Sequence, residues 1–473
     1  MVFSSAAFLF AFFPVYILIV AFVRHVRISN ALLLVMSLLF YAWGEPVYIL
    51  LMLFSMAVNF GMAWPARKYV ANDCIAKRVL LGTDVAFNLV MLALFKYAGF
   101  LVSSLDAMLG LSVPVPQIPL PIGISFFTFQ TMSYVIDAYR GTCGVQKNFA
   151  KFMLYVSFFP QLIAGPIVKY HDIERQLSVR STDVSRIAGG IRRFIVGLSK
   201  KMLLANVFGE TVDRIFALDS GDLNIVLAWA GGILYCLQIY FDFSGYSDMA
   251  IGLGKMAGFD FMENFNYPYT SFSMREFWKR WHISLTTWFR EYVYFPLGGN
   301  RKGSVRTGVN RMFVFVLTGL WHGAMWTFVA WGVFHGIFQL LETYVIHPEK
   351  WKHKALGYVY AMTVVMVGFT IFRADSMTQA GRFLWQMVAG FHFTKIGLLN
   401  AWGLLTFYNI FIFIAALVAM TPMVKLLANR FAEKYHAGTL VSCLQYGASL
   451  VLFALCVMSL ASSTYNPFIY FRF

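Results

Sequence analysis

One long apolar stretch, Met312–Val345, constrains the fold of this chain most. It carries almost no charge, yet it contains two histidines, His322 and His335. At about 1.5 Å per helical residue, a helix that enters a bilayer at Met312 reaches His322 after roughly 15 Å, about half of the hydrocarbon core. His335 lies equally deep when counted back from the other end, so a turn between them predicts both imidazoles near mid-membrane. Ionisable groups at that depth usually mark a pathway or a reaction. The alternative is a neutral histidine bonded to a backbone carbonyl.

The composition indicates a membrane protein. Of 473 residues, 59% are hydrophobic, 18% are aromatic and only 13% are charged, which is about half the charged fraction of a soluble fold. Several apolar runs are long enough to span a bilayer, and none shows the alternation of a barrel strand. The predicted class is therefore an all-α polytopic membrane protein.

The net charge of +16 is typical of basic cytoplasmic loops that face anionic lipid, and it could also attract an anionic substrate. The basic residues are spread through short loops, which argues against nucleic-acid binding. Five scattered cysteines show neither CxxC nor zinc-like spacing, so neither disulfides nor a metal site is expected. The first apolar run, 2–23, lacks a basic n-region and a clear cleavage site, which predicts a retained helix.

The charges of the loops predict the topology. A basic stretch after the first span places the amino terminus outside. A break at Gly44–Pro46 divides Ala31–Trp64 into two helices. The short, proline-interrupted run Phe152–Val168 predicts a re-entrant segment, which must be buried in protein. The complete count is about twelve spans in a single membrane domain, 1–473, with an extracytoplasmic tail, 463–473.

Two regions fit this topology less simply. The run Ile191–Phe208 has Lys200 and Lys201 at its middle, and it is kept as a span because omitting it would invert the charge pattern of the following loops. The region from Lys255 to Arg311 is less apolar and rich in aromatic and basic residues. We expect it to form short, partly embedded helices at the cytoplasmic face.

Two further stretches carry polar groups that an inert helical bundle does not need. YFDFSGYSDMAIG (Tyr240–Gly252) places Asp242 and Asp248 directly after an apolar span, with a glycine at the expected break. These residues could instead cap helix ends. EFWKRWHISLTTWFREYVYFPLGGNRKG (Glu276–Gly303) surrounds His282 with tryptophan, lysine and arginine. Such a stretch could bind a phosphate-bearing cofactor, or it could be an interfacial helix anchored on lipid headgroups.

The chain lacks the GxSxG, HExxH, P-loop and Rossmann patterns, so hydrolase, zincin and nucleotide-motor functions lack support. A proton- or ion-coupled transporter remains open at this point, because buried aspartate and histidine residues can relay protons.

Taken together, the motifs closely resemble the membrane-bound O-acyltransferase (MBOAT) family. The resemblance rests on YFDFSGYSDMAIG, ENFNYPYTSFSMREFWKRWHISLTTWFREYVYFPLGGNRKG and LTGLWHGAMWTFVAWGVFHG. It extends to MVFSS, FYAWGEP, LPIGISFFTFQTMSYVIDAYRG, FFPQLIAGPIVKY and IFRADS, and so covers most of the chain. The nearest branch resembles the bacterial alginate O-acetyltransferase membrane subunit, with the D-alanylation protein of teichoic acids close behind.

The resemblance implies a helical bundle with a central funnel from the cytoplasm to the outer face. It implies that His322 is the catalytic histidine, near the narrowest point of the funnel, and that His282 is the second functional polar position. His335 belongs to the same pattern and is expected to have a supporting role. In such a site His322 would act as a general base that desolvation keeps neutral.

The expected donor is an acyl thioester, acetyl-CoA first, used as a substrate, and no permanently bound cofactor or metal is expected. Its phosphates would pair with basic side chains of the Arg275–Lys302 region. The candidate donor-binding residues are Arg275, Lys279, Arg280 and Arg290.

The carboxyl end adds a separate clue. TYNPFIYFRF (Thr464–Phe473) resembles the terminal PFIY motif of the small protein that accompanies the D-alanylation MBOAT. The terminal tyrosine of that protein is the proposed recipient of the acyl group. Carried over, the resemblance predicts Tyr470 as an acyl acceptor. The alternative is an aromatic tail lying in the membrane interface.

The expected function is transfer of an acyl group, most simply acetyl, across the bacterial cytoplasmic (inner) membrane for O-acylation of a cell-surface polysaccharide. Membrane lipids and an extracytoplasmic, esterase-like acyltransferase are the expected partners. Two alternatives stay open at this stage: D-alanyl transfer from a carrier protein to teichoic acid, and non-covalent transport of a polysaccharide or an ion.

Overall fold

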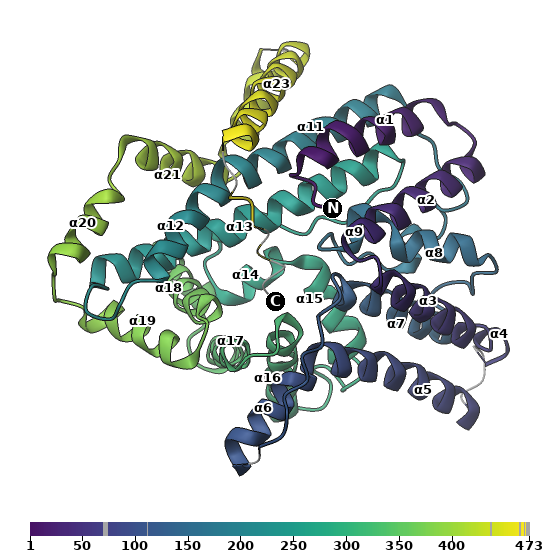
Figure 1. Ribbon diagram of the computed structural model, residues 1–473, viewed down its shortest axis with the longest axis horizontal. Coiled ribbons are helices and arrows are strands. Elements are labelled where there is room, and N and C mark those ends of the chain that lie inside the picture. Colours follow the sequence, from purple (N-terminus) through teal and green to yellow (C-terminus); the bar gives the residue numbers. More distant parts are fainter. Residues whose placement is uncertain (70–73, 111, 436–437, 463–464, 468, 470–473) are drawn as a thin grey trace. The chain divides into compact units, whose positions relative to one another are not determined.

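The computed structural model describes residues 1–69, 74–110, 112–435, 438–462, 465–467 and 469. Every element assigned within these residues is a helix (Figure 1). The predicted all-α class is therefore confirmed. The chain divides into two compact units. Unit 1 comprises Met1–Phe194 and Tyr246–Met262, and unit 2 comprises Ile195–Gly245 and Glu263–Phe473.

Unit 1 is built mainly from the first part of the chain. Its core includes the clustered rings of Phe3, Phe8, Phe40 and Phe159. Its helices are η1 (Phe8–Phe12), α1 (Phe13–Phe22), α2 (Val26–Gly44), α3 (Tyr48–Ala63), α4 (Ala66–Tyr69), α5 (Ile75–Leu92), η2 (Ala93–Tyr97), α6 (Ala98–Leu109), α7 (Ile124–Arg140), α8 (Phe149–Ser157), α9 (Phe159–Leu162), α10 (Tyr170–Ile173) and most of α11 (Val184–Ser199).

Unit 2 contains a second apolar core, rich in tryptophan and phenylalanine. Its first helices are η3 (Lys200–Ala205), α12 (Asn206–Phe216), most of α13 (Ile225–Met256), η4 (Pro268–Thr270), α14 (Met274–Arg280), α15 (Ile283–Phe289) and η5 (Arg290–Tyr294). The later helices are α16 (Ser304–His322), α17 (Trp326–Tyr344), η6 (Pro348–Lys350), α18 (Lys354–Arg373), α19 (Met377–Ala389), α20 (Lys395–Gly403), α21 (Phe407–Ala419), α22 (Met423–Lys434) and α23 (Gly438–Ser462).

Several described helices are long and apolar enough to cross a membrane. There are six of them, or seven if α20 and α21, which are bent by 59° at a short break, count as one span. The total of about twelve spans stays a prediction. The six segments are Val26–Gly44, Tyr48–Tyr69, Ile75–Leu109, Ile225–Met256, Lys354–Arg373 and Gly438–Ser462.

The prediction of a helix break at the glycine of the Tyr240–Gly252 stretch is wrong. Helix α13 runs without interruption from Ile225 to Met256. Gly245 serves close packing instead, because a Cβ atom there would lie 2.7 Å from the carbonyl oxygen of Gly197. Asp242 and Asp248 therefore lie inside a long helix and do not cap its ends.

The predicted interruption of Phe152–Val168 is confirmed. Helix α8 ends at Ser157, α9 is a short helix, and residues 154–170 are all buried. A broken backbone of this kind is tolerated at membrane depth only when protein surrounds it. The re-entrant position in a bilayer stays a prediction.

The two histidines of the long apolar stretch lie on a helical hairpin, as expected. Figure 1 shows α16, α17 and α18 side by side, and α17 contacts both neighbours. The turn does not lie midway between the histidines, however. Helix α16 begins at Ser304 and ends at His322 itself, whereas His335 lies well inside α17. His322 is thus placed directly at a helix end, where the backbone leaves the regular hydrogen-bonding pattern.

Candidate active site

His282 is held in an unusual backbone conformation at the start of α15. Its φ of 45° and ψ of 55° are in the left-handed region, which non-glycine residues rarely adopt. The backbone N–H of the next residue, Ile283, donates to the carbonyl oxygen of Asn264 at 2.9 Å. Such strain persists only where the surroundings enforce it, and it clusters at functional sites.

The side chain of Asn264 fixes the protonation state of His282. Asn264 Oδ1 accepts from the backbone N–H of Ser284 at 3.2 Å and from its hydroxyl at 2.9 Å. A backbone N–H can only donate, so the amide atom that faces it must be the oxygen. His282 Nδ1 lies 3.1 Å from the same oxygen and therefore carries the proton. In the neutral ring Nε2 is then left as a hydrogen-bond acceptor.

Burial favours the neutral form of His282. The residue is 2% exposed, and desolvation, to which the nearby His322 adds, holds the pKa of the His282 imidazole well below its ordinary value. The rings of His282 and His322 also both pack against the ring of Trp321. This proximity agrees with the roles that the resemblance implied for them.

His322 is enclosed by aromatic rings at the end of α16. It is 9% exposed, and the rings of Trp321, Trp331 and Phe372 lie edge-on to it at centroid distances of 5.1, 5.3 and 5.1 Å. Trp321 also lies 5.9 Å from the ring of His282. The two histidines are thus joined through Trp321 in one largely apolar, water-poor environment, where proton affinities differ most from those in water.

His335 has different surroundings. It is 1% exposed and lies against the rings of Trp278 and Trp331, at 5.1 and 5.0 Å. Neither of its ring nitrogens has a hydrogen-bond partner among the described residues. Gly368 permits this packing, since a Cβ atom there would lie 2.4 Å from His335 Nε2. Without a group to orient it, His335 is best suited to the supporting role expected from the sequence.

The four candidate donor-binding residues do not form one cluster of free cations. Arg280 pairs with Glu276 at 2.8 Å on the same helix, and Arg275 lies 3.7 Å from Glu349. Lys279 and Arg290 are exposed. Since Arg275 and Lys279 are four residues apart on α14, they share a face of that helix.

The predicted acyl acceptor, Tyr470, lies outside the described residues. Its neighbour Ile469 is described, and it is buried in the same apolar cluster as Trp331 and Phe372. The residue before Tyr470 is thus buried in the apolar core of unit 2.

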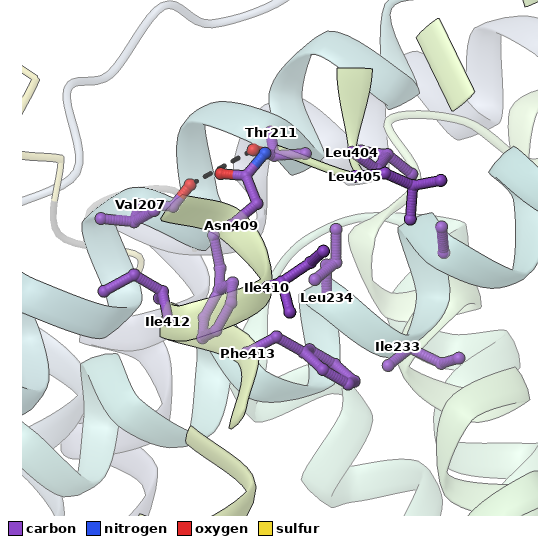
Figure 2. A pocket seen from close by; sticks show the side chains of 12 residues that line it. Val207, Thr211, Ile233, Leu234, Leu404, Leu405, Asn409, Ile410, Ile412 and Phe413 are labelled. Carbon is purple, nitrogen blue, oxygen red and sulfur yellow. Dashed lines mark hydrogen bonds between the residues drawn. The ribbon is translucent and has the colours of Figure 1, made fainter. Parts of the chain in front are cut away.

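A separate cavity lies between α12, α13 and α21, with a volume of about 230 Å³ (Figure 2). Its walls are largely apolar, with Thr211 and Asn409 as polar exceptions, and neither His282 nor His322 lines it. Within the described part of the chain, no group of three or more His, Cys, Asp or Glu residues is placed to hold a metal ion.

Sequence reasoning missed the contact of Asn264 with His282 and the pairing of Lys201 with Asp242. Asn264 was part of a quoted motif, but its contact with His282 depends on a loop conformation that no local pattern announces. Lys201 and Asp242 form a buried ion pair of 2.7 Å. Two lysines at the middle of an apolar run were a signal that a buried acidic partner was needed.

Comparisons with known proteins agree with the geometry. The model of the membrane-bound O-acyltransferase family matches residues 144–351. A "probable alginate O-acetylase" of Azotobacter vinelandii is 39% identical over 508 residues, which cover the whole of both chains. A protein of the same description from Pseudomonas aeruginosa is 42% identical over 81% of this chain and 74% of its own length.

Two other kinds of relative match less closely. The "peptidoglycan O-acetyltransferase" of Helicobacter pylori is 32% identical and covers 82% of this chain and 80% of its own length. The "teichoic acid D-alanyltransferase" of Bacillus subtilis is 27% identical over 53% of this chain and 68% of its own length. With a buried histidine pair in an all-helical, multi-pass membrane protein, and relatives that match along the whole chain, this protein belongs to the membrane-bound O-acyltransferase family and is an O-acyltransferase.

Proposed function

We propose that this enzyme takes an acetyl group from acetyl-CoA at the cytoplasmic face of the bacterial inner membrane and passes it outward for O-acetylation of a cell-surface polysaccharide. The names of its relatives support this choice, since one is described as a probable alginate O-acetylase and another as a peptidoglycan O-acetyltransferase. The observation that carries the mechanism is that His322 and a second histidine, His282, pack against the same tryptophan, Trp321, and that Asn264 fixes the tautomer of His282.

In this mechanism His322 is the general base. It accepts the proton of the attacking hydroxyl while the hydroxyl oxygen forms a bond to the thioester carbonyl carbon. The carbon–sulfur bond then breaks, and the departing thiolate takes the proton from His322 to leave as the free thiol. No proton is gained or lost over the complete step.

His282 is a positioning residue in this scheme. Because Nδ1 of the neutral ring carries the proton and donates a hydrogen bond to Asn264, the Nε2 atom can accept a hydrogen bond but cannot donate one. It therefore cannot stabilise the thioester oxygen while it is neutral. We assign it the task of accepting a hydrogen bond from His322 or from the attacking hydroxyl, which aligns the base and the nucleophile.

The donor phosphates are assigned to the exposed cations. Lys279 and Arg290 are exposed, and the guanidinium of Arg275 lies 3.7 Å from an exposed glutamate, so each can turn to a phosphate at little cost. Arg280 is the weakest of the four candidates, because it is already held by Glu276.

The attacking hydroxyl is proposed to be that of Tyr470. Attack by its phenol oxygen produces acetyl-tyrosine and free CoA. A separate extracytoplasmic, esterase-like acyltransferase then moves the acetyl group from the tyrosine to a sugar hydroxyl and regenerates the phenol. The burial of Ile469, the residue before Tyr470, in the apolar core of unit 2 supports this proposal.

The test is the intact mass of the carboxyl-terminal peptide after purified protein has been incubated with acetyl-CoA. We expect one acetyl group on Tyr470 in the wild type, and none in His322→Ala or Tyr470→Phe. Absence of this adduct together with labelled polysaccharide in membranes would retain the acetyltransferase and remove the tyrosine relay. Absence of both products would overturn acetyl-CoA as the donor.

D-alanyl transfer from a carrier protein is the remaining candidate. The D-alanyltransferase relatives are less similar and match only about half of this chain, so we rank it second. The same peptide mass, measured with a D-alanyl carrier as the donor, distinguishes the two. A purely non-covalent transporter lacks support in a chain that belongs to an acyltransferase family.

A further inference from the structure

The segment before Tyr470 is bound to unit 2 through its main chain. Lys201 Nζ donates to the carbonyl oxygen of Pro467. The backbone N–H of Ile469 donates to Asp242 Oδ2 at 2.8 Å. One residue on the fold thus binds a carbonyl of the tail, and another binds an N–H two residues further along.

Lys201 and Asp242 form a pair that is deeply buried. Their side chains are 4% and 2% exposed, and Lys201 Nζ lies 2.7 Å from Asp242 Oδ1. Burying two charges is costly unless further hydrogen bonds satisfy the remaining donors and acceptors. The main chain of the tail supplies one acceptor to the lysine and one donor to the carboxylate. The hydrogen-bonding groups of the buried pair therefore have the most partners when the tail is bound.

Close packing of two helical segments brings Lys201 and Asp242 together. Helix α13, which carries Asp242, approaches the segment with Lys201 very closely, since a Cβ atom on Gly245 would lie 3.3 Å from the backbone nitrogen of Lys201. Lys201 lies in η3, a π-helical turn. Such turns are rare in proteins, and those that occur are often found at functional sites.

Two further contacts hold the tail nearer to α23. Asn206 Nδ2 donates to the carbonyl oxygen of Tyr465 at 3.2 Å. The hydroxyl of Tyr465 donates to Asp213 Oδ2 at 2.6 Å, and the other oxygen of that carboxylate binds Arg373 at 2.6 Å. The tail is thus held at several successive residues, which is more than an aromatic tail lying in a membrane interface requires.

Helix α13, which carries Asp242, also packs against His282. Phe243, which follows Asp242 in α13, lies edge-on to His282 with ring centroids 4.7 Å apart. Ile469 is buried in the apolar cluster that contains Trp331. The helix that binds the tail is therefore also one that encloses the candidate active site.

We propose that the buried Lys201–Asp242 pair is a docking site for the chain's own carboxyl-terminal segment, and that it positions Tyr470 for acyl transfer. The role of Tyr470 rests on the proposed function above, whereas the docking does not. The pair recognises main-chain groups, so the docking does not depend on the side chains at 467 and 469.

The first experiment measures the docking alone. Hydrogen exchange is followed in the carboxyl-terminal peptides of the purified, full-length protein. The decisive variant is Lys201→Met with Asp242→Leu, because apolar replacement of a complete buried ion pair is often tolerated by the fold. We expect exchange at Ile469 to be about tenfold faster or more in this variant, since a hydrogen bond to a charged acceptor is lost.

Exchanging the charges of Lys201 and Asp242 distinguishes a docking site for the tail from an ion pair that only stabilises the fold. Lys201→Asp with Asp242→Lys restores opposite charges, but the new lysine cannot accept from Ile469 and the new aspartate cannot donate to Pro467. A merely structural pair predicts that the swap restores protection of the tail, and that result would overturn the proposal. Asp248→Asn is the matched control, because Asp248 lies on the same helix and pairs with Arg193 instead. We expect this control to leave the tail protected.

Exchange in the α16–α17 peptides reports whether each variant is folded. If the double variants do not fold, tail exchange is measured instead in Asp242→Asn, which is a smaller change. Acetyl transfer to Tyr470 is then measured on the same samples. We expect the variants to lower kcat for tail acetylation and to leave the KM for acetyl-CoA unchanged.

The two proposals fail in different ways. Tail exchange that is as fast in the wild type as in the variants would overturn the docking site. A protected tail that depends on the Lys201–Asp242 pair but never carries an acetyl group would establish the docking site and remove the tyrosine relay.

Discussion

Buried polar side chains have different partners in the two units. In unit 1, the guanidinium of Arg180 donates to Asn30 Oδ1 at 2.6 Å and to the carbonyl oxygen of Ala257 at 2.9 Å. These contacts join one part of the unit 1 fold to another. In unit 2, Lys201 and Asp242 instead bind the main chain of the carboxyl-terminal segment.

This difference separates stability from activity. A side chain that joins segments of a fold is needed for folding, and its loss lowers the free energy of unfolding. A side chain that positions a segment for transfer, as we propose for Lys201 and Asp242, is needed for activity, and we expect its loss to leave a folded but slow enzyme. Variants in the two units should therefore fall into two groups.

The largest effect is expected from His322→Ala in unit 2. Loss of a general base typically costs about 10²- to 10⁴-fold in rate, so we expect acetyl transfer to be nearly abolished while the yield of folded protein is almost unchanged. Transfer is measured as release of free CoA, and folding as the melting temperature in detergent.

His347→Asn serves as the control for this variant. His347 is a partly exposed histidine in the same unit, and asparagine tolerates its left-handed backbone conformation. We expect it to transfer normally. Loss of folded protein in His322→Ala would assign that histidine to structure and remove the contrast between the units.

Arg180→Ala in unit 1 should give the opposite result. It leaves buried Asn30 without a charged partner, and each lost hydrogen bond to a charged group costs about 1.5–3 kcal/mol. We expect a clear fall in melting temperature and yield, with unchanged transfer per folded molecule. Arg186→Ala removes an exposed pair with Asp260 in the same unit and should cost less than about 1 kcal/mol. Equal effects of the two variants would contradict the structural role of Arg180.

The sequence was sufficient to identify the elements that carry the candidate site residues. The depth of two histidines in an apolar stretch and the motif around His282 led to the residues that the structure brings together in unit 2. Helix ends were predicted well where proline or glycine interrupts the pattern, as at Gly44–Pro46. They were predicted poorly at Gly245, because a glycine that permits close helix packing looks the same in sequence as one that ends a helix.

Contacts between distant residues could not be predicted in the same way. The hydrogen bond from His282 to Asn264 depends on a left-handed residue between a loop and a helix, and no periodic pattern encodes it. Lys201 and Asp242 lie in different helices, so their pairing depends on the close approach of those helices. A buried lysine indicates that an acidic partner exists, but it does not identify that partner.

Asn264→Ala sharpens the comparison within unit 2. Removing the acceptor of His282 Nδ1 leaves a buried N–H unsatisfied at a cost of about 1–3 kcal/mol, and it releases the tautomer that keeps Nε2 as an acceptor. We expect transfer to fall about tenfold to a hundredfold, which is less than in His322→Ala. Ser284→Ala removes one other donor to Asn264 and retains the His282 contact, so it should have a much smaller effect on transfer. A larger effect of Ser284→Ala would show that the loop, and not the tautomer, matters.

The smallest effect is expected from a pH-sensitive ion pair of unit 1. His171 Nδ1 lies 2.9 Å from Asp137 Oδ2, and this hydrogen bond is the main reason that the pKa of His171 is raised above its ordinary value. A raised pKa in the folded state means that the pair stabilises fully below about pH 6.5, the ordinary histidine pKa. The stabilisation is lost as pH rises through the raised value.

We therefore expect His171→Gln to lower the melting temperature most at acidic pH, with the difference from the wild type disappearing under alkaline conditions. The His171 side chain is 26% exposed, so solvent screening should keep the effect below about 1 kcal/mol. Melting temperatures measured from pH 5.5 to pH 8.5 test the direction. Transfer per folded molecule should be equal in the two proteins, because this pair joins α7 to α10 within unit 1. A transfer rate that follows the titration of His171 would instead connect unit 1 to the reaction and break the division between the two units.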